Sequence, residues 1–140
     1  MKVRQTILSK LLLWGDNLVK STQNPIQTKV ASVFVHVNDM EKAVEWYSRL
    51  LGVPSRSGPY EKMYTIELEN LYLLLDNHRS GSFTPAEHAL FTLATNDIDK
   101  TYEFLQSIEV QVIGEIERFS DISFVTIKDL DGNKFIIVQE

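Results

Sequence analysis

The chain has 140 residues and a formal net charge of −5, from 14 basic and 19 acidic side chains. This length is typical of one domain with a short extension, and the acidic balance argues against a nucleic-acid partner, whose phosphates require a basic surface. There is no cysteine, so disulfides, thiol catalysis and cysteine-ligated zinc are excluded, and a reducing, cytoplasmic location is expected.

The first segment, residues 1–28, is predicted to be an extension to the domain. Apolar residues over 7–19 indicate a helix that docks on the domain or on a partner chain, and the polar stretch 21–28 indicates a linker. The apolar stretch is too short and too interrupted to span a membrane, so no membrane partner is expected.

A strand and a helix are predicted next. β-branched residues over 30–37 favour a strand, and Asn38 or Asp39 is the expected N-cap of a helix that continues to about Leu51. Gly52 is expected to end this helix. Three further strands are expected in this half, over 53–59, 62–68 and 71–76, of which the last is apolar enough to be buried on both faces.

The second half follows the same order after a connecting loop over 77–87. A strand is predicted over 88–95 and a helix over 97–108. The remaining strands are expected at 110–116, 123–128 and 134–139, with a tight turn at 129–133 before the last of them.

The two halves share a sequence repeat. Residues 35–47 reappear as residues 93–105 at a constant offset of 58, with Asn, Asp, Lys and Glu identical at four positions. Each copy combines a strand, an Asn-Asp helix start and an amphipathic helix. An internal repeat of this kind indicates one small domain built from two similar halves.

Two stretches carry a resemblance to a known family. Residues 33–52 read VFVHVNDMEKAVEWYSRLLG, and residues 129–138 read DLDGNKFIIV. They are similar to the strand, turn and "A-x-x-F-Y-x-x-x-L-G" helix, and to the "D-P-D-G-N-x-x-E-L" motif, of the vicinal oxygen chelate superfamily. That superfamily includes glyoxalase I, the bleomycin-resistance proteins and the extradiol dioxygenases. The resemblance implies an α+β domain over 29–140, in which two βαβββ modules, about 30–77 and 88–140, form an open cup-shaped mixed sheet.

The resemblance also implies where a metal would be held. Metal-dependent members place one ligand, usually His or Glu, on each of four strands, and the matching positions here are Ser32, Leu90, Leu73 and Ile136. One hydroxyl and three aliphatic side chains cannot hold a divalent ion, so neither a metal nor another cofactor is expected. A register slip that brought His88 into a ligand position would still supply only one imidazole.

What remains is a cup with apolar walls and a few polar groups, which is typical of a small-molecule site. The predicted ligand-binding residues are Ser32, Phe34, His36, Tyr64, Leu73 and Ile136. Strand alternation puts His36 on the same face as Ser32, where it either bonds a ligand or is satisfied by a neighbour near the strand end. His78 is expected to be solvated, and no catalytic residue is predicted.

The first hypothesis is a metal-free glyoxalase/bleomycin-resistance-like homodimer that binds a small, partly apolar molecule. Two alternatives stay open. One is a metal-dependent lyase or dioxygenase of the same superfamily with an atypical site, and the other is a structural or regulatory dimerisation module. Catalysis is therefore neither predicted nor excluded.

Overall fold

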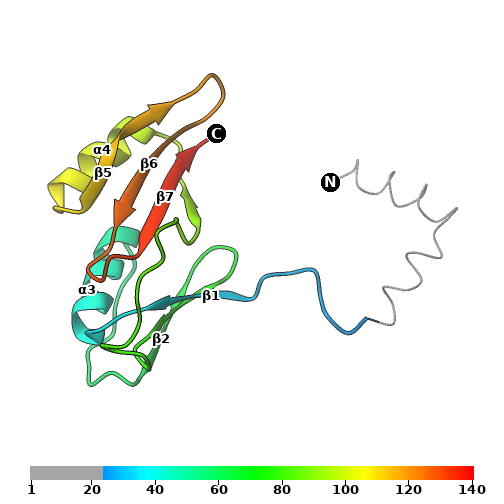
Figure 1. The fold of residues 1–140 in the computed structure, drawn as a ribbon, viewed down its shortest axis with the longest axis vertical. Coiled ribbons are helices and arrows are strands. Elements are labelled where there is room, and N and C mark those ends of the chain that lie inside the picture. Colours follow the sequence, from blue (N-terminus) through cyan, green and yellow to red (C-terminus); the bar gives the residue numbers. More distant parts are fainter. Residues whose placement is uncertain (1–23) are drawn as a thin grey trace, which may run out of the picture. The chain divides into compact units, whose positions relative to one another are not determined.

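The structure is a computed structural model that describes residues 24–140, and the predicted N-terminal helix lies outside the described residues. Residues Ala31–Glu140 form one compact unit, and the helices and strands below belong to it. In Figure 1 the first module of this unit runs from cyan to green and the second from yellow-green to red. Neither described helix has the length and apolar character that crossing a membrane requires.

The first module contains one helix and three strands. Its elements are β1 (Ser32–His36), α3 (Met40–Leu51), β2 (Met63–Glu67) and β3 (Tyr72–Asp76). They form a mixed sheet in the order β1-β3-β2, in which β1 is parallel to β3 and β2 is antiparallel to it. The strand predicted over 53–59 is not formed, so that prediction was wrong. Two prolines, Pro54 and Pro59, remove backbone donors from this short segment and disfavour a strand.

The second module contains one helix and four strands, as predicted. Its elements are β4 (Thr92–Ala94), α4 (Ile98–Ser107), β5 (Gln111–Arg118), β6 (Ser123–Lys128) and β7 (Lys134–Gln139). The strand order is β4-β7-β6-β5, with β4 parallel to β7 and the other pairs antiparallel. β6 and β7 have the predicted bounds, whereas β4 begins four residues later than predicted. Both sheets are mixed and each module adds one helix, so the predicted α+β class is confirmed.

Both helices begin and end on local sequence signals. The Asp39 side chain accepts a hydrogen bond from the Lys42 N–H at 3.1 Å, and Asp97 accepts one from the Lys100 N–H at 3.0 Å. These are N-caps at equivalent positions of the repeat, and each satisfies a donor that the helix leaves unpaired. Gly52 ends α3 with φ of 67°, a left-handed conformation that glycine adopts without steric cost.

The core lies on one face of each sheet, against the helices. Along β3, Leu73 and Leu75 are at most 1% exposed, whereas Tyr72 is 48% exposed. The prediction that this strand is buried on both faces was therefore wrong, because the described part of the unit covers only the face that packs on α3. The fully buried members of this core include Val35, Val37, Val44, Leu105, Val125, Ile127 and Phe135.

A buried polar cluster joins the two modules. Asp129, only 6% exposed, accepts hydrogen bonds from the backbone N–H groups of Asp131 and Asn133, both at 2.8 Å, and from the Asn133 side chain. It also accepts one from the Tyr47 hydroxyl of α3. The Asn133 amide in turn donates to the His36 carbonyl oxygen of β1 at 2.9 Å. The two modules thus pack against each other within one chain.

The electrostatics of this cluster favour a neutral Tyr47. Burial of the phenol opposes loss of its proton, and the Asp129 carboxylate beside it adds repulsion, so the pKa of Tyr47 is raised well above its ordinary value. The hydroxyl therefore remains a hydrogen-bond donor to Asp129 throughout the neutral range. This charge-assisted bond links α3 of the first module to the turn before β7 in the second.

Candidate functional site

A cavity of about 400 Å³ lies between the two modules. The first module contributes Phe34 and His36 of β1, the second contributes Leu90 and Asn133, and the loop over residues 79–86 closes the space between them. The volume is within the range of small-molecule sites, which are commonly about 300–1,000 Å³. Its apolar walls are Phe34, Phe83, Pro85, Ala86 and Leu90, and its charged or ionisable groups are His36 and Arg79.

Asn38 holds the connecting loop over this cavity. Its backbone carbonyl accepts from the Asn77 amide and the Ser80 hydroxyl, each at 2.9 Å, and its side-chain oxygen accepts from the Gly81 N–H at 2.7 Å. Its own N–H and side-chain amide donate to Asp131 of the second module, at 3.1 and 2.8 Å. Asn38 belongs to the repeated Asn-Asp turn, so a sequence feature that starts a helix also fixes a wall of the cavity.

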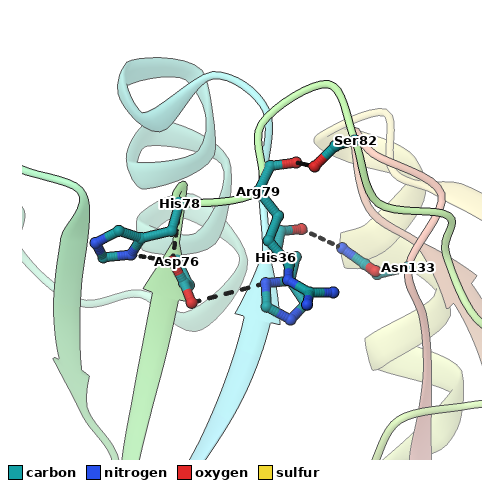
Figure 2. Close-up of polar contacts among 6 residues, drawn as sticks. All are labelled: His36, Asp76, His78, Arg79, Ser82 and Asn133. Carbon is teal, nitrogen blue, oxygen red and sulfur yellow. Dashed lines mark hydrogen bonds and ion pairs between the residues drawn. The ribbon is translucent and has the colours of Figure 1, made fainter.

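Two histidines converge on one buried carboxylate beside the cavity (Figure 2). Asp76, at the end of β3, is 9% exposed and accepts from the His78 N–H at 2.8 Å, and its Oδ1 lies 2.7 Å from His78 Nδ1. Its other oxygen lies 3.7 Å from Nδ1 of His36. The expectation that His78 is only solvated was therefore wrong. Its ring is exposed, but it is paired with a carboxylate two residues before it.

The pKa of Asp76 is lowered from its usual value of 3.8. Burial of the carboxyl opposes ionisation, but the hydrogen bonds from the His78 N–H and ring, and the nearby charge of the two imidazoles, outweigh that cost. The ionised carboxylate is therefore the form that the fold stabilises.

Removing this carboxylate is expected to reduce the acid sensitivity of folding. Because the folded pKa is depressed, the contribution of Asp76 is complete above the unfolded pKa and is lost as pH falls through the folded one. Asp76→Asn should therefore be less stable than the wild type near neutral pH, and it should lose less stability between about pH 5 and pH 2. Urea denaturation followed by circular dichroism at several pH values measures both. Glu69→Gln, in the exposed β2–β3 turn, is the control, and an equally steep acid loss in Asp76→Asn would contradict the assignment.

The predicted binding residues separate into two groups. Phe34 and His36 line the cavity, and their role in binding stays a prediction. Ser32 shares their face of β1 by strand alternation, and Ile136 lies on the face of β7 opposite the buried Phe135. Neither Ser32 nor Ile136 lines the cavity.

Tyr64 and Leu73 are on the core side of the first sheet. Leu73 is 1% and Tyr64 7% exposed, and both belong to the hydrophobic core. In the strand register Leu73 is opposite Val33, one residue from Phe34, so its side chain points to the other face of the sheet. The expectation that Leu73 shares a face with Phe34 was wrong by one residue of register, a shift that moves a side chain across the sheet.

Of the residues that line the cavity, only Phe34 and His36 belong to the predicted set, and the others include Arg79, Phe83 and Asn133. Arg79 and Phe83 lie in the loop over 77–87, which was interpreted only as a connection between the halves. One sequence signal does single out Arg79, which is the only lysine or arginine between Lys62 and Lys100.

The donor set at the family's metal positions does not fit a divalent ion. Ser32 supplies one hydroxyl, and Leu90 and Ile136 supply no ligand atom. Leu73 is buried on the opposite face, and Leu74, which the register places opposite Phe34, supplies none either. Within residues 24–140, no three His, Asp or Glu side chains gather in a way that could hold a metal ion. Divalent metals of the kinds used in this fold need several nitrogen or oxygen ligands on one open site.

The fold and the cavity define a class of protein with two related strand-and-helix modules that enclose a site between them. A family model of the Glyoxalase/Bleomycin resistance protein/Dioxygenase superfamily matches residues 29–137. The chain belongs to this superfamily. A comparison with proteins of curated function found no match.

Solved structures show the same fold. A superfamily member from Sphaerobacter thermophilus is 24% identical with a TM-score of 0.65, over 81% of this chain and 98% of that one. A glyoxalase/bleomycin resistance protein from Catenulispora acidiphila is 25% identical with a TM-score of 0.60, over 81% and 99%. A lactoylglutathione lyase from Agrobacterium tumefaciens is 15% identical with a TM-score of 0.63, over 81% and 94%. At these identities the likeness shows architecture, and function has to be argued from the site.

Proposed function

We propose that this chain is a metal-free member of the superfamily that binds a small, partly apolar molecule in the cavity between its modules. The observation that carries the proposal is the composition of the cavity, which combines an apolar wall with a few polar side chains, of which His36 and Arg79 are ionisable. Aromatic and aliphatic walls supply binding energy by burying ligand surface, and a few polar groups fix the ligand's orientation. The poor donor set at the family's metal positions supports the metal-free part of the proposal.

A ligand screen tests the binding function directly. A compound that binds the folded state at a hundred times its dissociation constant adds about 2.7 kcal/mol to stability, so a thermal-shift screen of aromatic and amphiphilic compounds should yield hits. The same purified protein, prepared without chelator, should carry no stoichiometric Zn, Ni, Fe or Mn. About one metal equivalent per chain would favour the metal-dependent lyase or dioxygenase, whereas no hit across the library would favour the structural module.

The cavity wall provides the matched variant for this screen. Phe34 is 52% exposed, so Phe34→Ala should leave the fold nearly intact while it weakens the binding of hits by about tenfold, the loss expected for one aromatic contact. Phe119→Ala removes an aromatic ring of similar exposure from the β5–β6 turn, away from the cavity, and should leave affinity unchanged. Titration calorimetry compares the three proteins. Equal weakening by both variants would place the binding elsewhere.

We also propose that the protein is a cytoplasmic homodimer. Large apolar side chains outside the cavity lining remain exposed on strands, among them Tyr72 of β3 and Ile113 of β5, and a second copy would bury them. The lack of cysteine agrees with a reducing compartment.

A further inference from the structure

The lining of the cavity has no acidic side chain, although the chain as a whole is acidic. The lining contains one guanidinium, from Arg79, and one imidazole, from His36, and no carboxylate. The protein as a whole carries a net charge of −5, so a lining without acidic groups differs in charge from the chain as a whole. A wall of this kind favours a ligand with a negative charge.

Arg79 lies in a loop held by hydrogen bonds, and its guanidinium forms no ion pair with another residue among residues 24–140. The Arg79 backbone carbonyl accepts hydrogen bonds from both the N–H and the hydroxyl of Ser82 at 2.9 Å, which closes a turn, and Asn38 holds the same loop. Figure 2 shows the Arg79 side chain extending from this loop in the direction of His36. None of the ion pairs formed by residues 24–140 involves Arg79. Its planar fork of donors therefore remains available for a carboxylate, whose two oxygens match it.

His36 supplies the second polar contact. Its Nδ1 is buried and faces Asp76 Oδ2 at 3.7 Å, too far for a hydrogen bond, so the carboxylate lies behind the ring. Nε2 is then the ring nitrogen left for a ligand. The ring also packs on Phe83 with 5.6 Å between centroids, which limits how it can turn. Asp76 itself is occupied by His78 and does not line the cavity, so it presents no free carboxylate to an entering anion.

Resting on the proposed binding function, we propose that the ligand is a hydrophobic carboxylate, held by Arg79 and His36 at its charged end and by the Phe34, Phe83 and Leu90 walls along its apolar body. A single guanidinium with one imidazole suits a singly charged planar anion. The apolar walls disfavour a small, fully hydrated anion. Such an anion would lose its hydration on entering the cavity and has no apolar part whose burial would offset that cost.

Two probes of the same shape test this inference. 2-Naphthoate and 2-naphthamide differ in charge but share the bicyclic body, and each is titrated calorimetrically into the full chain. The naphthoate should bind about tenfold more tightly or better, as one charge-assisted hydrogen bond predicts. Arg79→Gln should remove that preference and leave naphthamide affinity within about twofold. Arg49→Gln makes the same charge change on the surface of α3, where Arg49 pairs with Glu45, and should preserve the preference.

The outcomes distinguish a failure of this inference from a failure of the proposed function on which it rests. If both probes bind equally to the wild type and Phe34→Ala still weakens them, the cavity binds small molecules but the anion site is wrong. A preference that survives in Arg79→Gln also overturns the role of Arg79. If neither probe binds, the carboxylate inference fails, and it fails together with the proposed function if the wider screen also gives no hit.

Discussion

Asp129→Ala is expected to lower the free energy of unfolding by about 3 kcal/mol or more, because it leaves several buried donors without an acceptor. Those donors are the backbone N–H groups of Asp131 and Asn133, the Asn133 amide and the Tyr47 hydroxyl. A buried polar group that loses its partner costs about 1–3 kcal/mol, and not every donor will find water in its place. The loss should be large because the substitution disrupts both a turn and the contact between modules.

Urea denaturation at neutral pH, followed by circular dichroism and by tryptophan fluorescence, measures the effect. Asp121→Ala is the control, since Asp121 is an exposed aspartate in the β5–β6 turn and its loss should change stability by about 0.5 kcal/mol or less. A loss below about 1 kcal/mol in Asp129→Ala would mean that the cluster contributes little to holding the modules together.

Phe135→Ala is expected to cost about 3–5 kcal/mol, the usual range for truncating a buried aromatic side chain. Phe135 is 1% exposed, and its ring centroid lies 5.9 Å from that of Tyr47 and 4.8 Å from that of Phe91. It thus fills the space between β7, α3 and the segment before β4. Truncation removes apolar contacts from both modules and leaves a cavity that the surrounding side chains only partly refill.

Phe104→Ala is the matched control for this core substitution. Phe104 lies on α4 and is 42% exposed, so the same chemical change should cost well under half as much. Thermal and urea denaturation of both variants give the comparison. Similar losses in the two proteins would show that Phe135 is not part of a shared core between the modules.

Local signals in the sequence predicted the elements that they control. The start of the first helix was predicted at Asn38 or Asp39, and the cap is Asp39. The start of the second helix at Asp97, the stop at Gly52 and the bounds of β6 and β7 also follow from short-range chemistry: a side-chain acceptor at a helix start, a residue free to take positive φ, and β-branched runs next to a tight turn. The repeat predicted the strand, turn and helix that begin each module, since each copy encodes these three elements.

Features that depend on a partner far along the chain were predicted less well. The face of Leu73 depends on its register against Val33, which no local pattern specifies, because an apolar run reads the same on either face. The segment over 53–59 shows the opposite problem, since its weak strand pattern is overruled by prolines. Only a small part of the cavity was predicted. Phe34 and His36 follow from strand alternation, whereas Arg79 lies in a loop that is bonded to Asn38, the residue between β1 and α3.

The bonds of Asn38 make the loop and the module joint mechanically dependent on each other. One residue connects Ser80 and Gly81 of the cavity wall to Asp131 of the second module. We therefore expect a displacement that separates the modules to move the loop as well, so that access to the cavity and the angle between the modules change together. Asn96, the repeat-related residue, forms no such bridge among residues 24–140, and the coupling is consequently one-sided: only the first copy of the turn transmits it.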